Sequence, residues 1–477
     1  MLGRWSAGSG PLYRRLADAL KTAIARGDVP PDTRLPAERV LARSLNVSRS
    51  TVVSAYDLLY AEGLVVRRQG SGTWIAPESA AAARRAHLGN VWVPQAALRT
   101  IIDNPGNVIP FTASTVDRLP DILPADAFRV SFEEVVANPP YFEVPEGLPR
   151  LREVIAALYS ERGLETAPDQ IVVTSGAQQA IALVAAAHLA PGDLALVESP
   201  TFPGAIDALG LTGARLRGIP VGRDGADLAS IERTVVQGHV GLVYVIPTFH
   251  NPTGTLMPSP RRRDLGEILS SWGVPTIDDE SLVDLSLNGE VPRPLASFAA
   301  RAPIYSVGSL SKLFWGGLRV GWVRCPGDAV GPILRLKSVS DLSTSLVSQA
   351  IALRLLEQRG AVTSARREQL RHKLALWSDL LRTHLPSWTF EPPIGGLSLW
   401  VDTGVDAPAL AQFALREGVA LVTSTETTVD RTAGTYVRLP LALENRLIEE
   451  GVRRLARAYG HLTAEDGRGE PSASLVV

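Results

Sequence analysis

The spacing of hydrophobic residues separates the chain into two regions with different patterns. Near the N-terminus, Leu12, Leu16, Leu20 and Ile24 recur every four residues, which predicts an amphipathic helix. From about residue 109 onward, short apolar runs of strand length alternate with longer stretches of helical periodicity. The pattern therefore predicts a small helical unit followed by an α/β domain, in which helices cover a mostly parallel sheet.

Two more helices and a hairpin are predicted within the small N-terminal unit. Pro36 can occupy the first turn of the second helix, and Ser48 can cap the start of the third. Strands at 64–67 and 73–75 follow directly, joined by a turn that contains Gly-Ser-Gly. Three helices and a hairpin in this order indicate a winged helix-turn-helix, while a small helical domain with a solvated basic face is the alternative.

Charge distinguishes this unit from the rest of the chain. Residues 1–76 contain eleven Lys and Arg against six Asp and Glu, a net charge of +5, which leaves −6 for the remainder of a chain whose total is −1. A basic unit on an acidic body favours a polyanionic partner for that unit. The residues expected to contact double-stranded DNA are Arg39, Ser48, Arg49, Ser50, Thr51, Arg67, Arg68 and Gly70.

Several features bear on compartment and on the ends of the chain. The single cysteine, Cys325, excludes an internal disulfide framework, and the apolar run 180–187 stops far short of a membrane span. We therefore expect a cytoplasmic protein with no membrane partner, and no metal is expected. Residues 77–108, rich in Ala, Pro, Asn and Arg, are predicted to be a linker, and the polar tail 463–477 is predicted to be disordered.

Short strands are predicted in the large region, and each candidate for chemistry follows one of them. The strands are expected at 171–174, 194–197, 242–246, 276–277 and 304–307. Because open parallel sheets bind ligands beyond the carboxyl ends of their strands, we expect the side chains at these positions to line one site.

The most informative of these segments is Ser309-Leu310-Ser311-Lys312, with Arg319 seven positions after the lysine. The amine of Lys312 can take an aldehyde as an imine, and Ser309 and Arg319 can hold a phosphate, the arginine as a charge-assisted donor. Pyridoxal phosphate (PLP) carries both groups. Alone, a serine-rich turn beside a lysine is most often only a turn, so the interpretation depends on residues upstream.

Two upstream segments can complete such a site. Gly176, Ala177 and Gln178 follow a strand and open a helix, where small residues let backbone N–H groups approach a phosphate. Phe202, after the next strand, can stack on a pyridine ring. Considered singly, the first segment is an ordinary strand-to-helix turn and the second is a core aromatic.

Three polar residues can serve the remaining contacts. Asn251, in Asn-Pro-Thr-Gly, can donate its amide to the phenolic oxygen of the cofactor, and Asp278 can keep the pyridine nitrogen protonated, which makes the ring an electron sink. The neighbouring Asp279 and Glu280 are expected to lie in a solvated loop. Arg438, inside an apolar strand, can grip a carboxylate bidentately, although a lone arginine there is usually a structural ion pair.

Residues 11–76 resemble the GntR-type DNA-binding domain. The match runs through Leu-Pro-Ala-Glu-Arg at 35–39, Val-Ser-Arg-Ser-Thr-Val at 47–52, Leu-Leu-Tyr-Ala-Glu-Gly-Leu at 58–64 and the Gly-Ser-Gly-Thr wing at 70–73. The resemblance implies a winged helix-turn-helix that binds an operator, with the third helix entering the major groove.

Residues 109–462 resemble the PLP-dependent transferases of fold type I, the aspartate-aminotransferase-like fold with a large and a small subdomain. The ordered set of Gly-Ala-Gln, aromatic, Asn-Pro-Thr-Gly, Asp, Ser-x-x-Lys and Arg carries this resemblance. It implies PLP as cofactor and Lys312 as the catalytic Schiff-base lysine. The cofactor-binding residues would be Gly176, Ala177, Gln178, Phe202, Asn251, Asp278, Ser309, Ser311, Lys312, Arg319 and Tyr141.

Two further expectations follow from the same resemblance. Tyr141 matches the family tyrosine that reaches the phosphate of the partner subunit's cofactor, and Arg438 would take a substrate or effector carboxylate. One position departs from the pattern, because Ser281 stands where the family usually has a tyrosine that also bonds the phenolic oxygen, and serine is too short to reach it directly. Cofactor binding is expected to survive this change, whereas the change disfavours efficient transamination.

A GntR-type head, residues 1–76, joined by a linker to an aminotransferase-like body resembles the MocR/GabR family of bacterial transcriptional regulators. The resemblance implies a domain-swapped, head-to-tail homodimer, nucleoid-associated when bound to DNA, in which each head packs against the other subunit's body. PLP, or its adduct with a small amino compound, would shift the heads and control promoters of vitamin B6 or amino-compound metabolism genes.

Two alternatives stay open at this point. The first is an active PLP-dependent aminotransferase with an accessory DNA-binding domain, which Lys312, Asp278 and Arg438 favour and Ser281 disfavours. The second is a DNA-binding protein whose body is a vestigial dimerisation scaffold without a cofactor. The nearly complete set of phosphate and ring anchors counts against that second alternative.

Overall fold

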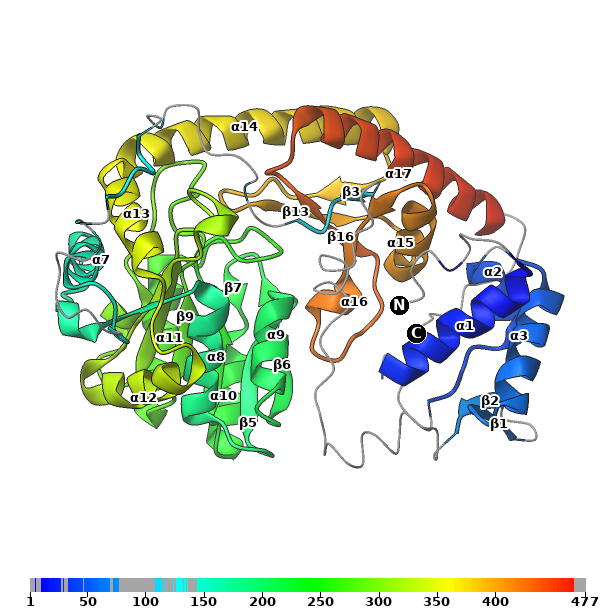
Figure 1. Ribbon diagram of the computed structural model, residues 1–477, viewed down its shortest axis with the longest axis horizontal. Helices are drawn as coiled ribbons and strands as arrows, with labels where there is room; N and C mark the ends of the chain where they lie inside the picture. Colours follow the sequence, from blue (N-terminus) through cyan, green and yellow to red (C-terminus); the bar gives the residue numbers. More distant parts are fainter. Residues whose placement is uncertain are drawn as a thin grey trace.

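The computed structural model describes residues 10–26, 33–45, 47–68, 72–76, 108–113, 126–131 and 144–466, with a few isolated positions between these ranges. Figure 1 shows the N-terminal head in blue, the large domain of the body in cyan to yellow, and the small domain in yellow to red apart from its cyan strand β3. The head has a hydrophobic cluster of its own, the large domain has two, and a further cluster joins the small domain to one side of the large domain.

The head consists of three helices and a two-stranded hairpin, as predicted. Its elements are α1 (Leu12–Arg26), α2 (Glu38–Ser44), α3 (Arg49–Ala61), β1 (Val65–Arg68) and β2 (Gly72–Ile75). The strands pair antiparallel, with Val65 opposite Ile75. Pro36 lies before α2 rather than in its first turn, because the helix begins at Glu38 after Ala37.

The core of the head comes from one face of each helix. Leu16, Leu20 and Ile24 of α1 pack in a cluster with Val52 and Tyr56 of α3, while Leu12 at the start of the four-residue repeat stays exposed. The Ser48 hydroxyl accepts a hydrogen bond from the N–H of Thr51 at 3.2 Å, which is the side-chain cap that the sequence predicts for the third helix.

The large domain alternates strands with helices. Its elements are α7 (Pro149–Glu161), η1 (Pro168–Gln170), β4 (Ile171–Thr174), α8 (Ala177–His188), β5 (Leu194–Ser199), α9 (Pro203–Gly210), β6 (Arg215–Gly222), β7 (Gly225–Ala226), α10 (Leu228–Gln237), β8 (Leu242–Val245), α11 (Ser259–Trp272), β9 (Thr276–Asp279), η2 (Leu295–Phe298), β10 (Ile304–Ser309), η3 (Gly316–Leu318), β11 (Gly321–Arg324), η4 (Gly327–Ala329), α12 (Val330–Ser340) and α13 (Leu346–Glu357).

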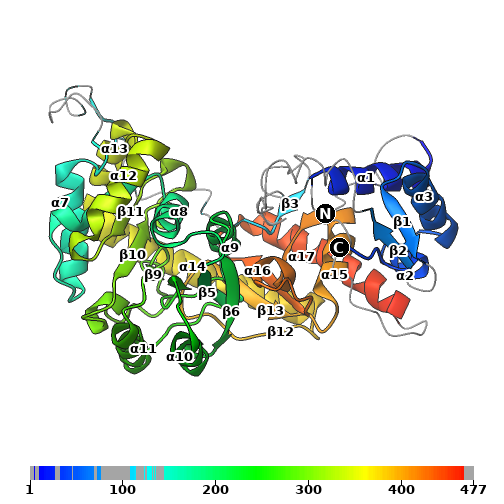
Figure 2. The ribbon, with the colours of Figure 1, turned by 90° about the horizontal axis from the view of Figure 1, so that it is seen from below.

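These strands form one sheet in the order β4-β11-β10-β9-β8-β5-β6-β7. The central strands β10, β9, β8, β5 and β6 run parallel, whereas β11 is antiparallel to both β10 and β4. Figure 2 shows α8 and α12 on one side of this sheet and α10 and α11 on the other. Strands covered on both faces need continuous apolar runs, as in Leu242–Val245, and the mostly parallel, helix-covered sheet predicted from sequence is confirmed.

The small domain packs a second sheet against long helices. Its elements are β3 (Ile109–Pro110), α14 (Arg359–His384), β12 (Thr389–Phe390), β13 (Ser398–Asp402), α15 (Ala407–Arg416), β14 (Val419–Ala420), β15 (Val422–Thr423), α16 (Ser424–Thr427), β16 (Tyr436–Pro440) and α17 (Asn445–Asp466). The sheet order is β12-β13-β16-β15, and β3 pairs with β14 beside it. Figure 1 shows α14 running across the top of the molecule from the large to the small domain.

Several elements differ from the sequence prediction. Strand β9 continues to Asp279 and β10 to Ser309, so both reach the residues that were expected to follow them. Strand β11 was not predicted. Helix α17 extends to Asp466, so residues 463–466 of the expected disordered tail are helical, and residues 467–477 lie outside the described part of the chain.

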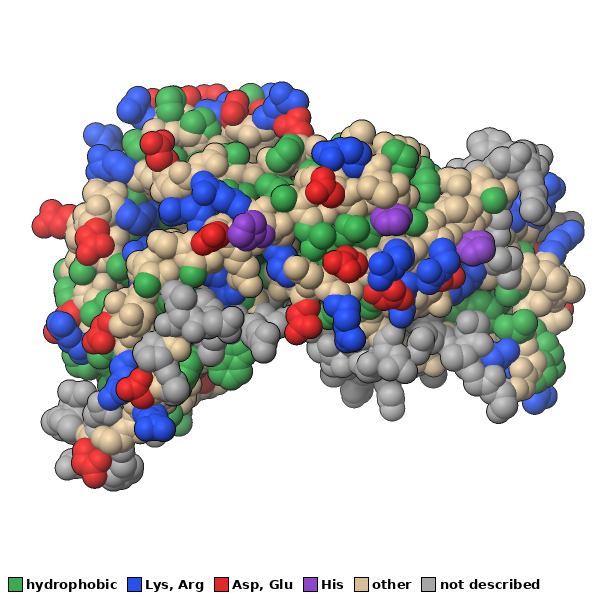
Figure 3. All heavy atoms as spheres, turned by 90° about the horizontal axis from the view of Figure 1, so that it is seen from above, with side chains coloured by type: hydrophobic (Ala, Val, Ile, Leu, Met, Phe, Trp, Pro, Cys, Tyr) green, Lys and Arg blue, Asp and Glu red, His purple; other side chains and the backbone are tan. Residues whose placement is uncertain are grey.

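The surface of the body carries both signs of charge. On the face in Figure 3, Lys and Arg side chains are interspersed with Asp and Glu. On α17, for example, Glu450 pairs with Arg453 and Arg454. Among the described helices, none combines the length and the apolar composition that a membrane crossing requires.

Candidate functional site

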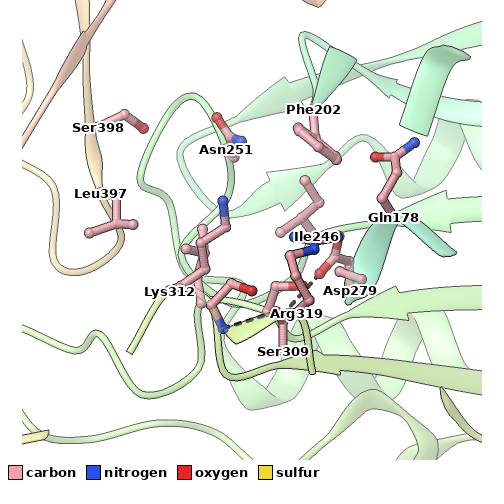
Figure 4. Close-up of a pocket in the computed structure, with 14 residues that line it drawn as sticks. Gln178, Phe202, Ile246, Asn251, Asp279, Ser309, Lys312, Arg319, Leu397 and Ser398 are labelled. Carbon is pink, nitrogen blue, oxygen red and sulfur yellow. Dashed lines mark hydrogen bonds between the residues drawn. The ribbon is translucent and has the colours of Figure 1, made fainter. Parts of the chain in front are cut away.

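A cavity of about 140 Å³ opens at the carboxyl ends of the parallel strands, between the two domains of the body. Figure 4 shows side chains from the large domain converging on it, with Leu397 and Ser398 of the small domain on the opposite side. The residues that line it are Ala177, Gln178, Phe202, Ile246, Asn251, Asp279, Ser281, Leu282, Ser309, Ser311, Lys312, Arg319, Leu397 and Ser398.

One end of the cavity is built from the start of α8 and from Arg319. Gly176 adopts a φ of 124°, and a Cβ at this position would lie 3.0 Å from Nη2 of Arg319. Glycine therefore lets the guanidinium come close to the backbone at the helix N-terminus. The backbone of Arg319 itself adopts the left-handed helical conformation, with a φ of 54°. This conformation costs a non-glycine residue about 1 kcal/mol. Backbone N–H groups and a guanidinium together suit an anion.

Serine hydroxyls complete this end of the cavity. The Ser309 hydroxyl accepts a hydrogen bond from the N–H of Ser311 at 3.2 Å. The Ser311 hydroxyl is buried and has no hydrogen-bond partner among the described residues. A buried hydroxyl without a partner is costly unless a ligand or water satisfies it, so Ser311 has a donor and an acceptor available at the cavity.

Lys312 extends into the middle of the cavity (Figure 4). Burial, and then the Arg438 guanidinium, lower the pKa of Lys312 to about 8, against the Asp279 carboxylate, which raises it. The segment after the lysine is fixed from the small domain, because the buried Arg366 of α14 donates to the carbonyls of Leu313 and Phe314, each at 3.0 Å. The lysine is thus a good nucleophile near neutral pH on a firmly held segment.

The structure corrects the prediction for the ring-nitrogen carboxylate. Asp278 does not line the cavity, whereas Asp279 does. Since β9 continues through both residues, their side chains point to opposite faces of the sheet. The Asp279 carboxylate accepts hydrogen bonds from the Tyr244 hydroxyl at 2.7 Å and from the N–H of Ser281 at 2.9 Å.

Asp278 belongs to a buried cluster on the other face. Its carboxylate accepts a hydrogen bond from the N–H of Leu295 at 3.2 Å. Burial, and then the charge of Glu280, raise the pKa of Asp278 to about 8, although Arg262 and Arg162 oppose the shift. Glu280 is buried and pairs with Arg162 at 2.6 Å. The prediction that Asp279 and Glu280 lie in a solvated loop is therefore wrong for both.

The structure brings most of the other predicted body residues together. Asn251 and Phe202 line the cavity, and the side-chain amide of Gln178 donates to the carbonyl of Gly204 at 2.7 Å. Arg438 does not line it but lies behind Asn251, donating to that side chain at 3.5 Å and to the carbonyl of Thr112 at 2.5 Å. Nε of Arg438 has no partner within the described structure.

Some lining residues were not predicted from the sequence. Ile246, Leu282, Leu397 and Ser398 close the cavity, and Ser281 faces it as well. The sequence did carry a signal for Asp279 and Ser281. Side chains alternate along strand β9, and this strand continues further than predicted. No local signal marks Leu397 and Ser398, which belong to the small domain and lie more than a hundred residues after Asp279 and Ser281.

The head presents most of its predicted DNA-contacting residues on the surface. Ser48, Arg49 and Ser50 are exposed on the first turn of α3, and Arg49 pairs with Glu38 of α2 at 3.1 Å. On the wing, Arg68 lies 4.7 Å from the ring centre of Trp74 and Arg67 lies 5.1 Å from that of Tyr60. Arg39 is also exposed and Thr51 is half-buried, while the predictions at Gly70 and Tyr141 fall outside the described residues.

Comparison with known families accounts for both parts of the chain. Residues 12–75 match the family described as bacterial regulatory proteins of the gntR family. Residues 138–455 match the family described as aminotransferase class I and II, which covers about two thirds of the chain. The two matches coincide with the winged head and with the two-domain body.

Relatives with both parts are similar along most of their length. YisV of Bacillus subtilis, an uncharacterized HTH-type transcriptional regulator, is 30% identical over 84% of this chain and 86% of its own. The probable rhizopine catabolism regulatory protein MocR of Rhizobium meliloti is 31% identical over 82% of this chain and 81% of its own.

Among solved structures, LysN, an α-aminoadipate aminotransferase of Thermus thermophilus complexed with N-(5'-phosphopyridoxyl)-L-leucine, has a TM-score of 0.69 at 28% identity and covers 77% of this chain and 95% of its own. The body therefore has the fold-type I aminotransferase architecture. Together with the gntR-family head and the matching regulators, this places the chain in the MocR-type family of transcriptional regulators, which join a GntR winged helix-turn-helix to an aminotransferase class I and II domain.

Proposed function

We propose that this protein binds PLP covalently at Lys312 and changes its affinity for operator DNA when PLP, or an adduct of PLP with a small amino compound, occupies the cavity. The observation that carries the proposal is the convergence, in one cavity, of Lys312, an anion-binding end at Arg319 and a carboxylate at Asp279. The DNA-binding head lies on the same chain, so cofactor binding and DNA binding can be thermodynamically linked.

The donors and acceptors of the cavity fit PLP group by group. The start of α8, Ser309, Ser311 and Arg319 would hold the phosphate, and the orphaned Ser311 hydroxyl supports this. Asp279 would face the ring nitrogen, and Phe202 would stack on the ring. When bound, PLP would supply an aldehyde that primary amines attack and a ring that withdraws electrons. Lys312 would hold that aldehyde until an effector amine competes for it.

The neighbourhood of Lys312 supports an effector that carries a carboxylate. Arg438 lies behind Asn251, is charged and buried, and has an unused Nε donor among the described residues. Arg438 itself does not line the cavity, and the small-domain residues that do are Leu397 and Ser398. An α-amino acid would place its amine at Lys312 and its carboxylate toward Arg438.

An exposed apolar segment supports a homodimer. Val339 is 90% exposed, Leu342 54% and Val347 49%, all between the end of α12 and the start of α13. The same segment contacts β4, which leads to the start of α8, because the Thr344 hydroxyl donates to the carbonyl of Val173. A second subunit would cover this surface and bring its Tyr141 to the phosphate. Sedimentation of Leu342→Asp is expected to shift toward the monomer, and an unchanged dimer would place the interface elsewhere.

The head supports recognition of double-stranded DNA in the bacterial cytoplasm, at the nucleoid. The exposed first turn of α3, Ser48 to Thr51, would enter the major groove, with Arg39, Arg67 and Arg68 toward phosphates. In the domain-swapped dimer, each head would pack against the other subunit's body. The genes under control would belong to vitamin B6 or amino-compound metabolism.

A second candidate, an aminotransferase with an accessory DNA-binding domain, is supported by Lys312 and Asn251 lining the same cavity while Arg438 contacts Asn251. With Asp279 at the ring nitrogen, the position three residues on is Leu282 rather than Ser281, and neither side chain is a long hydroxyl that could bond the phenolic oxygen, which counts against this candidate. Steady turnover of an amino donor and a keto acceptor by the purified protein would favour this candidate. A single conversion of the bound cofactor without turnover would favour the regulator.

The deciding experiment measures DNA binding as a function of cofactor state. The dissociation constant for the control region of the protein's own gene would be measured for apo-protein, for PLP-loaded protein, and for PLP-loaded protein with a panel of α-amino acids and amines. We expect a change of at least about fivefold between two of these states, the lower range of known couplings. Lys312→Ala should abolish the difference while it retains DNA binding. Identical affinities in every state would refute the proposal.

A further inference from the structure

A tyrosine in the middle of the central sheet contacts the carboxylate at the floor of the cavity. Tyr244 lies on β8, is completely buried, and donates a hydrogen bond from its hydroxyl to Oδ2 of Asp279 at 2.7 Å. Strands β8 and β9 are parallel neighbours with Tyr244 opposite Ile277. Because side chains alternate along a strand, Asp279 lies on the same face as Ile277, two residues closer to the cavity.

The Asp279 carboxylate is held at both oxygens. Tyr244 donates to Oδ2, and the N–H of Ser281 donates to Oδ1 at 2.9 Å. Each carboxylate oxygen can accept about two hydrogen bonds, so capacity remains on the cavity side. With both oxygens engaged, rotation of the carboxylate would break one hydrogen bond or the other.

Tyr244 acts as a donor throughout the working range of pH. Burial, and then the Asp279 carboxylate, raise the pKa of Tyr244 well above its usual value of 10.0. The phenol therefore keeps its proton and remains a donor to Oδ2 of Asp279. Asp279 is also the single carboxylate among the described residues that line the cavity, so no other acid there can replace it.

We propose that Tyr244 is a positioning residue that orients the Asp279 carboxylate toward the ring nitrogen of PLP. This inference rests on the proposed function, because it assigns Tyr244 to the same cavity and the same cofactor. An ionised carboxylate at the ring nitrogen keeps that nitrogen protonated, which makes the ring electron-withdrawing. Because neither Ser281 nor Leu282 can bond the phenolic oxygen of the cofactor, the fixed carboxylate and Asn251 would be the main polar contacts to the ring.

The alternative is that Tyr244 serves only to fill the core. Tyr305 on β10 provides a matched control, because it is also buried in the same hydrophobic cluster and its hydroxyl contacts His188 at 2.7 Å. It does not line the cavity. Tyr244→Phe and Tyr305→Phe each remove one hydrogen-bonded hydroxyl from that cluster, but only the first removes a contact to Asp279.

The test compares binding of PLP with binding of 1-deaza-PLP, in which carbon replaces the ring nitrogen. Absorbance titration of full-length apo-protein is expected to show that Tyr244→Phe weakens PLP binding by about tenfold, the usual cost of leaving a charged acceptor unpaired. Binding of the deaza analogue should be unchanged, because it makes no contact with Asp279. Tyr305→Phe should leave both affinities as in the wild type.

A double variant keeps the test decisive if Tyr244→Phe is poorly folded. If Tyr244 acts through Asp279, the Tyr244→Phe/Asp279→Asn protein should bind PLP no more weakly than Asp279→Asn alone. Equal losses for PLP and its deaza analogue, or additive losses in the double variant, would overturn the inference. Failure of the proposed function would look different, since wild-type protein would then take up no PLP or Lys312→Ala would retain it covalently.

Discussion

Asp278 and Asp279 are consecutive residues of β9, and their carboxylates lie on opposite sides of the central sheet. Asp279 faces the cavity and Tyr244, whereas Asp278 bonds the N–H of Leu295 on the other face. The alternation of a strand, rather than the chemistry of either residue, decides which carboxylate is available to a ligand.

Asp279→Asn is therefore expected to weaken PLP binding, while Asp278→Asn is not. Loss of one charge-assisted contact costs about 1.5–3 kcal/mol, or about 10- to 100-fold in affinity. Absorbance titration of the two apo-proteins measures this directly. Equal losses in both variants, or a loss confined to Asp278→Asn, would show that the assignment of faces is wrong.

The stability of the apo-protein is expected to fall as pH rises through the range in which Asp278 titrates. Because burial and Glu280 raise the pKa of Asp278 to about 8, the folded state keeps a proton that the unfolded chain releases near pH 4. The bound proton stabilises the folded state fully below pH about 4, and this stabilisation is lost as pH rises toward the folded pKa. The free energy of unfolding falls by no more than about 1.4 kcal/mol per pH unit. Melting temperatures of Asp278→Asn should depend less on pH between 5 and 9. An equally steep dependence in the variant would assign it to other groups.

The rate at which apo-protein takes up PLP is expected to rise with pH and to level off above about pH 8. Burial and Arg438 lower the pKa of Lys312 to about 8, and only the neutral amine attacks an aldehyde. Stopped-flow absorbance between pH 6 and 10 measures the profile, with Lys312→Ala as the control that should lack this phase. A rate that keeps rising through pH 10 would indicate an ordinary exposed lysine.

Arg438→Gln is expected to reduce the preference of the PLP-loaded protein for an α-amino acid over the amine that lacks the carboxylate. The charge-assisted pair contributes about 1.5–3 kcal/mol, so the preference should fall by about 10- to 100-fold. Titrations with leucine and isopentylamine, followed by the absorbance of the bound cofactor, give both affinities. If the two affinities change by the same factor, Arg438 supports the cavity without contacting the carboxylate.

Arg49→Ala is expected to weaken operator binding by about 1–3 kcal/mol while PLP uptake is unchanged. Arg49 is 69% exposed in its side chain on the first turn of α3, and its surface pair with Glu38 adds little to stability. Arg14→Ala on the exposed face of α1 is the matched control and should leave binding within about twofold. Equal weakening in both variants would indicate a general charge effect rather than a contact of α3.

Local patterns in the sequence were sufficient to predict many of the helices and strands and most of the segments that form the cofactor site. The four-residue repeat of α1, the cap at Ser48 and the apolar runs of β4 and β8 depend on neighbours along the chain, and the structure contains each of them. The segments that carry Lys312, Arg319, Asn251 and the start of α8 follow strands, so the rule for parallel sheets sufficed to bring them together.

The sequence by itself thus determined the two-part organisation, the fold class and the segments that meet at the cavity. Tertiary structure alone decided that Asp279 rather than Asp278 faces it, that Tyr244 bonds this carboxylate, and that Arg366 holds the segment after Lys312. Strand ends and contacts between distant elements depend on hydrogen bonding and packing across the sheet, which no short stretch of sequence encodes.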